Sequence, residues 1–351
     1  MWRKLQLAIV LAGAAGKAPA QVTLEYIAHA CFVVQAPSGV RIAIDPYNGY
    51  RWLGYSFPEG LKAHAVLVTH PHYDHDASYY FGPDTLVFRA PGEYAVGEVR
   101  IRGVAGRHAE PYGAEFGRTN TLWVLETGGI RIAHLGDTGP LTPAMASALG
   151  RVDVLLLPVD GQEHILKYAE IDAIRATLRP KVTIPMHYQI AELSDLPKDL
   201  GPLRFPGARR MGSHRVVVTL PREPEVWALP HSPEVRPWTK SLREARAAWT
   251  AKDFRKAVDL APGVSLFALD LARSLKDSEE AIRVLERALA AAGRTDHEYT
   301  IHMRSLLADL YAARGEQALA ELQYRLIRSA SPWIEPRRKA ERFLASLDAK
   351  P

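Results

Sequence analysis

The segment Thr69-His70-Pro71-His72-Tyr73-Asp74-His75-Asp76 follows directly on the apolar run of residues 65–68 and is the most informative part of the chain. Four of its side chains, His70, His72, Asp74 and His75, form an H-x-H-x-D-H pattern. If the apolar run is a strand that ends in a tight loop, positions 70 and 72 point to one side, and positions 74 and 75 turn toward a second point nearby. Imidazole nitrogens and carboxylate oxygens bind zinc at about 2.0–2.2 Å. The pattern predicts a metal site rather than a solvated histidine-rich loop.

Three further ligand-type residues follow β-type runs downstream. His108 lies in a Gly-Arg-His-Ala segment, Asp137 follows the run of residues 130–134, and His187 follows the run of residues 182–185. Each residue alone is weak evidence, since a single histidine at a strand end is more often structural. Together with the first motif, they predict enough ligands for two metal ions.

The organisation of the chain places these motifs in a layered α/β domain. Short β-type runs broken by Gly, Pro, Asn and Asp extend from residue 22 to about residue 220. Helical stretches at residues 143–149 and 170–178 separate the later runs, which favours sheets covered by helices. The expected strands cover residues 22–27, 31–35, 40–44, 65–69, 121–126, 130–134, 154–158, 182–185 and 216–220.

This part of the chain resembles the metallo-β-lactamase-fold superfamily of metal-dependent hydrolases, and most closely its ascorbate-6-phosphate-lactonase-like branch. The resemblance implies an αββα sandwich with the metal site at one edge, between two sheets. The segments that carry it are residues 27–32 (IAHACF), 44–47 (IDPY), 69–76 (THPHYDHD), 132–139 (IAHLGDTG), 152–158 (VDVLLLP) and 184–188 (IPMHY).

The resemblance also implies a ligand set for a dinuclear site. One metal is expected on His70, His72 and His108, the second on Asp74, His75 and His187, with Asp137 bridging both. Zinc is the first choice on ligand softness, with manganese or iron as alternatives. Two such ions supply a bridging hydroxide near neutral pH. The catalytic candidates are Asp137, as the bridge, and Asp74, as a proton shuttle.

The same resemblance narrows the chemistry and leaves the substrate open. An aspartate at position 137 points toward lactone, thioester, phosphodiester or phospholipid hydrolysis rather than β-lactam cleavage. The short interval from residue 137 to residue 187 disfavours RNA-processing members, and nucleic acid is not an expected partner. The candidate substrate contacts are Tyr188, His164 and Arg107, each weighed against a structural role. Asp45 is expected to shape the loop beside the site, and His134 to be a buried, hydrogen-bonded histidine.

The length of 351 residues favours two domains, and the sequence texture changes near residue 230. Residues 21–225 are expected to form the hydrolase domain, and the proline-containing residues 226–238 a linker. Residues 239–351 are rich in Ala, Leu, Glu and Arg and resemble degenerate tetratricopeptide repeats, with a plain helical bundle as the alternative. Such a domain could bind a protein partner, dimerise, cap the active-site cleft or add stability.

The first twenty residues have the layout of a secretory signal peptide. A basic start is followed by an apolar run and by Ala-Pro-Ala before Gln21. Export to the periplasm or the medium is the expectation, with a cytoplasmic protein as the alternative. No other segment reads as membrane-spanning. The net charge of +5 says little about partners, and the single cysteine, Cys31, excludes an intramolecular disulfide.

Two functions of different classes follow. The favoured one is a dinuclear metal-dependent hydrolase, with zinc as the expected ion, that cleaves an ester, lactone or phosphodiester bond in a small molecule or lipid. The alternative is an exported binding or scaffold protein, in which the helical domain recruits a protein partner and the metal site is structural. Retention of every expected ligand favours the hydrolase.

Overall fold

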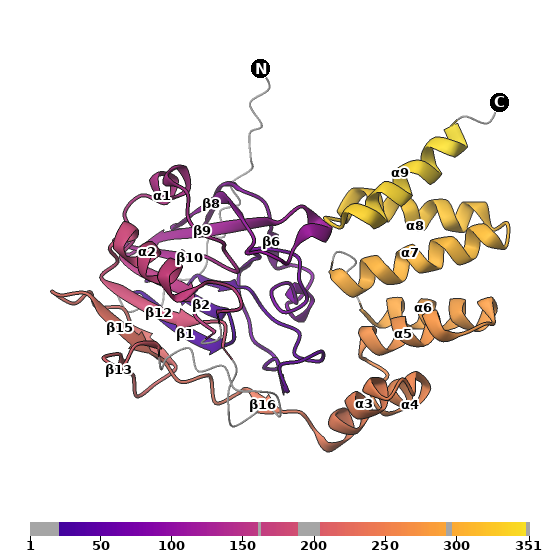
Figure 1. Cartoon of the computed structure of the whole chain (residues 1–351), viewed down its shortest axis with the longest axis horizontal. Coiled ribbons are helices and arrows are strands. Elements are labelled where there is room, and N and C mark those ends of the chain that lie inside the picture. Colours follow the sequence, from indigo (N-terminus) through magenta and orange to yellow (C-terminus); the bar gives the residue numbers. More distant parts are fainter. Residues whose placement is uncertain (1–20, 161–162, 189–203, 293–296, 349–351) are drawn as a thin grey trace.

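The computed structural model describes residues 21–160, 163–188, 204–292 and 297–348. The predicted signal peptide, residues 1–20, lies outside this part of the chain. A β-sandwich is followed by a stack of helices beside it (Figure 1). The two units confirm the expected fold class, an α/β sandwich followed by an all-helical region.

The sandwich contains a six-stranded and an eight-stranded sheet, together with a small two-stranded one. The six-stranded sheet has the order β14 (Arg215–Val217), β1 (Thr23–Ala28), β2 (Cys31–Gln35), β3 (Arg41–Ile44), β5 (Ala65–Leu67), β6 (Leu86–Phe88). The eight-stranded sheet has the order β13 (Arg209–Arg210), β15 (Glu225–Ala228), β12 (Val182–Met186), β11 (Val154–Pro158), β10 (Ile130–His134), β9 (Thr119–Thr127), β8 (Val99–Arg107), β7 (Gly92–Val96). Strands β10, β11, β12 and β15 run parallel to one another, as do β3, β5 and β6.

The main core lies between the two large sheets, and strand alternation builds it. On β5, Ala65 and Leu67 face this core, whereas Val66 faces outward into a second apolar cluster. On β11, Val154 and Leu156 face the core, and the residues between them face the helices. Because both faces of these strands are covered, the strands are apolar throughout.

The outer faces of the two sheets are covered differently. Helices α1 (Pro143–Leu149) and α2 (Tyr168–Leu178) pack on the eight-stranded sheet through residues such as Leu149 and Ile174. The resemblance implied helices on the six-stranded sheet as well. In the described residues its outer face instead carries Tyr47, Leu53 and Tyr55 from the loop after β3, with Phe81 after the 3-10 helix η1 (Ser78–Tyr80).

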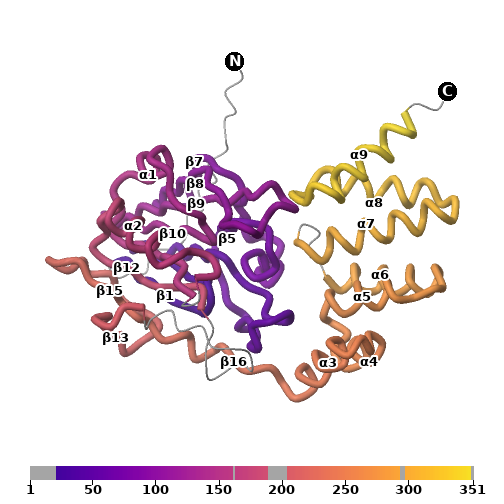
Figure 2. The backbone as a smooth tube through the Cα atoms, in the orientation of Figure 1, coloured from indigo at the N-terminus to yellow at the C-terminus, as the bar shows by residue number. Residues whose placement is uncertain are grey.

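The predicted linker, residues 226–238, is not a free connector. Residues 225–228 form β15, whose Val226 pairs with Thr183 of β12, and residues 236–237 form β16 (Arg236–Pro237), which pairs with β4 (Tyr55–Ser56). Figure 2 shows the chain passing along the sandwich from β15 through β16 to the first helix of the second unit. The prolines bound short strands here, and Trp227 buries its ring in the core between the sheets.

The second unit consists of helices in which each packs on the next along the chain. Apolar faces built from residues such as Leu285, Leu307 and Ile327 meet in one core. The tetratricopeptide interpretation of these helices stays a prediction. None of the described helices is long and apolar enough to cross a membrane. The helices are α3 (Lys240–Thr250), α4 (Phe254–Leu260), α5 (Ser265–Ser274), α6 (Ser278–Ala292), α7 (Glu298–Ala313), α8 (Gln317–Ala330) and α9 (Ile334–Asp348).

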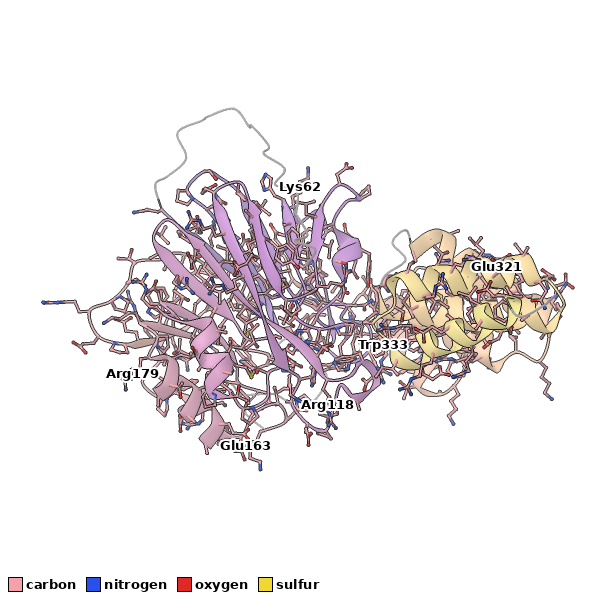
Figure 3. All side chains as sticks on the ribbon, turned by 90° about the horizontal axis from the view of Figure 1, so that it is seen from above. Lys62, Arg118, Glu163, Arg179, Glu321 and Trp333 are labelled. Carbon is pink, nitrogen blue, oxygen red and sulfur yellow. The ribbon has the colours of Figure 1, made fainter. Side chains whose placement is uncertain are left out.

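The two units meet through aromatic side chains beside the THPHYDHD loop. Trp333, between α8 and α9, lies at the junction (Figure 3) and packs edge-to-face on Phe116 with 5.4 Å between ring centroids. Ile301 of α7 completes this buried cluster. Tyr299 stacks on Tyr73 at 5.8 Å between ring centroids. The helical unit is therefore packed against the loop that carries the predicted metal ligands.

Candidate metal centre

The predicted ligands lie at strand ends that share one edge of the sandwich. His70 follows β5 in one sheet, and His108, Asp137 and His187 follow β8, β10 and β12 in the other. Backbone hydrogen bonds tie these ends together across the sheets. The Ala109 N–H donates to the Asp137 carbonyl at 2.8 Å, and the Thr121 N–H donates to the Thr69 carbonyl at 2.7 Å. Segments far apart in the sequence thus converge on one point.

His70, His72 and His108 form one of three overlapping ligand-type groups in the described residues. A second group surrounds Asp74, and a third joins His70 and His75 to Asp137. In the first group, each histidine offers a ring nitrogen within 4.8 Å of those of the other two. The rings of His70 and His108 meet nearly at right angles, with centroids 4.6 Å apart. This is the set that the sequence analysis expected for the first metal.

The second group contains Asp74, His75 and His187, as expected, and also His29. The Nε2 atom of His29 lies 3.3 Å from Oδ2 of Asp74. The ring of His29 lies 4.2 Å, between centroids, from that of His187. His29 stands in the turn between β1 and β2 and adopts a left-handed backbone with a φ of +56°.

Asp137 lies between the two groups. Its Oδ1 is 3.2 Å from Nε2 of His75, and its Oδ2 is 3.2 Å from Nε2 of His187. The same Oδ2 is 3.7 Å from Nε2 of His108 and 3.9 Å from Nε2 of His70. A carboxylate in this position can contact cations held by either group.

The polar atoms of this cluster have the pattern expected of a metal site. Within the described part of the chain, the buried Nε2 atoms of His70, His75, His108 and His187 make no hydrogen bond. Buried polar groups without partners are rare, because each costs about 1–3 kcal/mol. Four imidazole nitrogens aimed at one carboxylate are a suitable donor set for divalent transition metals. The residues present therefore fit the metal ions that the fold implies.

Asp45 supports the cluster from behind. Its Oδ2 lies 2.7 Å from Nδ1 of His75 and accepts the Thr69 hydroxyl at 2.6 Å, and its Oδ1 accepts the Thr69 N–H at 2.8 Å. A carboxylate on Nδ1 orients an imidazole so that Nε2 faces the metal. The expectation that Asp45 shapes the loop is confirmed. His134 is confirmed as buried, with Nε2 2.8 Å from the Ala30 carbonyl oxygen.

The charges of the cluster are strongly coupled. Burial alone would raise the pKa of Asp137, yet the neighbouring His187 and His75 hold it well below its usual range. Asp137 and Asp45 in turn raise the pKa of His75 well above its usual value, against the effect of burial. Burial lowers the pKa of His29 to about 3, so this histidine is neutral. Asp137 is thus ionised and His29 neutral, whereas His75 carries a proton that a metal ion at its Nε2 would displace.

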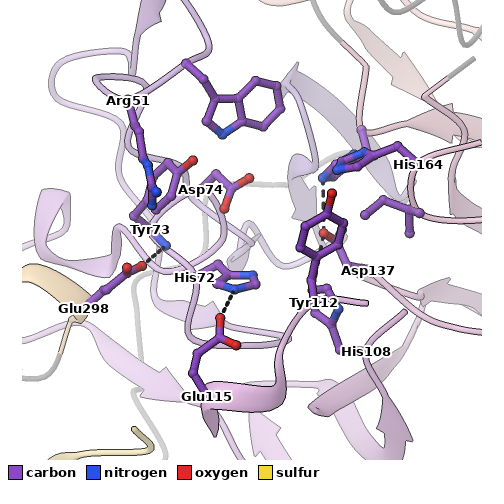
Figure 4. A pocket seen from close by; sticks show the side chains of 13 residues that line it. Arg51, His72, Tyr73, Asp74, His108, Tyr112, Glu115, Asp137, His164 and Glu298 are labelled. Atoms are coloured by element: carbon purple, nitrogen blue, oxygen red, sulfur yellow. Dashed lines mark hydrogen bonds and ion pairs between the residues drawn. The ribbon is translucent and has the colours of Figure 1, made fainter. Parts of the chain in front are cut away.

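A pocket of about 350 Å³ opens in front of the cluster. Figure 4 shows Arg51, Tyr73 and Glu298 on one side of it, with Tyr112 and His164 on the other. Of the three predicted substrate contacts, only His164 lines this pocket. Its Nδ1 lies 2.9 Å from Oδ2 of Asp160.

The other two predicted substrate contacts lie elsewhere. Arg107 is exposed on β8 and is absent from the described lining of the pocket. Tyr188 packs on Tyr26, with 6.1 Å between ring centroids, and burial raises its pKa to about 12. Arg107 precedes His108 at the end of β8, where adjacent side chains point to opposite faces. Tyr188 follows β12 after His187, whose backbone is left-handed with a φ of +61°.

The sequence analysis missed His29 in the ligand cluster and, among the residues that line the pocket, Glu115 and Glu298. His29 belongs to a quoted motif but carries no ligand spacing, so only the structure reveals its position. Glu115, in the 3-10 helix η2 (Ala114–Phe116), lies 3.0 Å from Nε2 of His72, and that interaction lowers the pKa of Glu115 to about 2. Glu298 comes from α7 of the helical unit, and its Oε2 accepts the Tyr73 N–H at 3.0 Å. Burial raises the pKa of Glu298 to about 7.

Comparison with known proteins gives the class and then the family. Residues 23–187 match the model of the beta-lactamase superfamily domain, which confirms the predicted resemblance. A UPF0173 protein of Pyrococcus furiosus is 31% identical over 184 residues, which cover 46% of this chain and 80% of that protein. A UPF0173 metal-dependent hydrolase of Myxococcus xanthus is 30% identical over 212 residues, which cover 50% of this chain and 75% of the relative. The chain belongs to the UPF0173 family of the metallo-β-lactamase superfamily.

A solved structure is similar to part of this chain. A Thermotoga maritima protein of the metallo-β-lactamase superfamily is 29% identical, with a TM-score of 0.46. The match covers 60% of this chain and 100% of that protein.

Gly136, directly before Asp137, provides a test of how tightly the centre is packed. Its φ is +53°, and a Cβ there would lie 2.5 Å from Oγ1 of Thr69 and 2.6 Å from Oδ1 of Asn120. We expect Gly136→Ala to lower the free energy of unfolding by about 3 kcal/mol, the sum of the left-handed backbone and overpacking penalties. The measurement is chemical denaturation followed by circular dichroism.

Gly129 supplies the matched control for this substitution. Its φ is +77°, and no neighbouring atom of the described residues lies within 4 Å of the added Cβ. Gly129→Ala should therefore cost only the backbone term, about 1–2 kcal/mol. Equal losses for the two variants would contradict the close packing around Gly136.

Proposed function

We propose that the chain is a hydrolase that uses two divalent metal ions, most simply zinc, to cleave an ester, lactone or phosphodiester bond. The observation that carries this proposal is the convergence of unpartnered imidazole Nε2 atoms on Asp137. A purely structural metal site uses a closed set of four ligands and has no need of an adjoining pocket. Here two ligand groups share one carboxylate and border a pocket.

The residues would hold the ions in two sets joined by Asp137. His70, His72 and His108 would bind one ion, and Asp74, His75 and His187 the other, with His29 beside the second set. When bound, two such ions supply a water of lowered pKa and stabilise the negative charge that develops on a carbonyl or phosphoryl oxygen.

The chain's own side chains would manage the protons. Asp74 lines the pocket, and its Oδ2 lies 3.3 Å from Nε2 of the neutral His29. In our proposal Asp74 accepts a proton from the attacking water and passes it to the leaving group. His164 and Tyr112, whose rings lie 5.3 Å apart between centroids, offer polar groups from the opposite side of the pocket.

The size of the pocket favours a small molecule or the headgroup of a lipid. Its volume of about 350 Å³ lies at the lower end of the range of roughly 300–1,000 Å³ for small-molecule sites. This supports an ester, lactone or phosphodiester substrate of modest size, and Asp137 argues against a β-lactam.

The proposal is tested with a panel of substrates. Metal-loaded protein is assayed on a lactone, an aryl ester, a thioester, bis(4-nitrophenyl) phosphate and a phospholipid. We expect turnover of at least one class, and we expect His72→Ala to lower kcat/KM by about 10²-fold or more, because one ligand of the first metal is lost. Circular dichroism establishes that the variant is folded.

His64→Ala is the matched control, since His64 lies at the far end of β5, away from the pocket lining. It should retain full activity. Metal-loaded protein that cleaves none of the five classes would contradict the proposal, as would an unchanged rate in His72→Ala.

We also propose that the chain is exported, on the sequence of residues 1–20 alone. A mature N-terminus near Gln21, measured by mass spectrometry of the protein from its own cells, is the expected result. An intact Met1 would contradict it.

A scaffold function for the helical unit stays a prediction from its repeat-like sequence. The placement of Glu298 in the pocket favours a role for this unit in catalysis.

A further inference from the structure

The helical unit holds the rim of the pocket in place through Arg246. This side chain, on α3, donates from Nε at 2.9 Å and from Nη2 at 2.7 Å to the backbone carbonyl of Arg51. Arg51 lies in the loop between β3 and β4 that borders the pocket. Two charge-assisted bonds to one carbonyl fix the position of this loop more firmly than a neutral contact would.

Arg51 presents its own side chain to the pocket, where Tyr73, Tyr299, Glu298 and Asp74 raise its pKa against the effect of burial. The guanidinium carbon lies 5.3 Å from the centroid of the Tyr73 ring. Within the described part of the chain, the guanidinium makes no hydrogen bond and no ion pair. Among the described residues that line the pocket, it is also the one lysine or arginine. Figure 4 shows it on the same side as Asp74 and Tyr73.

The surface on which Arg51 rests is likewise held by the helical unit. Glu298 accepts the Tyr73 N–H at 3.0 Å, and Tyr299 stacks on the Tyr73 ring. The carboxylate of Glu298 is thus engaged by the backbone of the THPHYDHD loop. Trp52, the residue after Arg51, adds a half-buried indole to the same wall of the pocket.

We propose that Arg51 forms an anion-binding subsite, positioned by Arg246, for a carboxylate or phosphate group of the substrate that is separate from the scissile bond. A guanidinium offers five N–H donors in a planar fork that matches the oxygens of either anion. The Trp52 indole would contact the apolar link between that anion and the reacting group. The subsite rests on the proposed hydrolase function and specifies its substrate class as an anionic ester or lactone.

The first test compares two esters with the same leaving group. 4-Nitrophenyl acetate is neutral, whereas mono(4-nitrophenyl) succinate carries a carboxylate. We expect Arg51→Ala to lower the ratio of kcat/KM for the succinate ester to kcat/KM for the acetate ester about tenfold or more, because one ionic contact to the carboxylate is lost. Arg51→Lys should retain part of the preference for the succinate ester over the acetate ester, since lysine keeps the positive charge but lacks the planar, two-pronged guanidinium.

Arg246→Ala tests the positioning role. It should lower the ratio of succinate to acetate kcat/KM in the same direction as Arg51→Ala, with metal content unchanged. Arg255→Ala is the matched control on α4, where Arg255 pairs with Glu280 away from the pocket. It should leave the ratio unchanged. A ratio that Arg51→Ala does not alter would overturn the subsite.

The second test needs no turnover. Isothermal titration calorimetry measures the binding of succinate, and separately of glycerol 3-phosphate, to metal-loaded wild-type protein and to Arg51→Ala. We expect Kd for at least one anion to rise about tenfold or more in the variant. Preference for one probe would tell a carboxylate substrate from a phosphate one. The proposal would be overturned if Arg51→Ala bound both anions with the wild-type Kd, or if the wild type bound neither anion.

The two tests separate the subsite from the hydrolase function. Esters that are cleaved with no dependence on Arg51 contradict the subsite alone. Anion binding that depends on Arg51, in metal-loaded protein that cleaves no ester or phosphodiester, contradicts the hydrolase function while the anion site stands.

Discussion

Asp137→Asn is expected to lower kcat/KM by at least about 10²-fold and to remove at least one metal ion per chain. Loss of a single transition-state contact already costs about 10²–10³ in rate, and Asp137 lies between both ligand groups. Its carboxylate oxygens are 3.2 Å from Nε2 of His75 and of His187. Asparagine keeps the shape of the side chain but removes the negative charge that two cations would share.

The measurement combines elemental analysis of the purified variant with kinetics on the best substrate of the panel. Asp153→Asn is the matched control, because Asp153 is also buried but binds the Arg131 N–H and the Arg151 guanidinium, away from the pocket. It should keep the wild-type metal content. An Asp137→Asn variant with full metal content and full activity would remove Asp137 from the centre.

Asp45→Ala is expected to lower the free energy of unfolding by about 3–5 kcal/mol, the usual cost of removing one partner from a buried charged pair. Asp45 is fully buried, and its two oxygens contact Thr69 and the Nδ1 of His75. The variant should also bind metal about 10–100-fold more weakly, because a metal-ligating imidazole loses the group that orients it.

Asp45→Asn provides the graded comparison. Its amide oxygen can still accept the Thr69 N–H, and asparagine tolerates the left-handed backbone, with a φ of +47°, at this position. We therefore expect a smaller loss of stability than for alanine, with metal affinity still reduced. Denaturation of metal-free protein and competition with a chelator measure the two effects separately. Wild-type metal affinity in both variants would show that Asp45 does not orient His75.

The convergence of the candidate ligands could be predicted from the sequence because they follow strands. His70, Asp137 and His187 each come after an apolar run, and runs of this type end at one edge of a sandwich of parallel strands. For these three residues, the apolar run before each one is enough to predict its place at the end of a strand. Asp45 and His134 were placed correctly for the same reason.

The substrate side could not be predicted in this way. Arg107 precedes His108 in extended chain, where neighbouring side chains point to opposite faces. Tyr188 follows the left-handed residue His187 and packs on Tyr26 instead of lining the pocket. Glu298 reaches the pocket because the helical unit packs on the THPHYDHD loop, and Arg246 of the same unit contacts the backbone of Arg51. These contacts join residues 225 and 195 positions apart, so no local pattern could reveal them. His29 was missed because its ligand position depends on a turn that brings it to Asp74.

The strands within the predicted linker could not be predicted for a related reason. The prolines of residues 226–238 indicate an irregular segment, yet Val226 and Trp227, which precede them, belong to β15. Strand β15 lies late in the sequence, and it is held by pairing with β12 of the large sheet. Local sequence does not reveal such a long-range pairing. The composition of this segment alone favours a loop.

The dinuclear centre is tested most directly by counting the metal. The protein is equilibrated with zinc, dialysed against metal-free buffer and subjected to elemental analysis together with protein quantification. Two ligand groups joined by one carboxylate predict about two zinc ions per chain, since each group supplies at least three donors. A content of one ion per chain, or of none, would contradict the dinuclear centre.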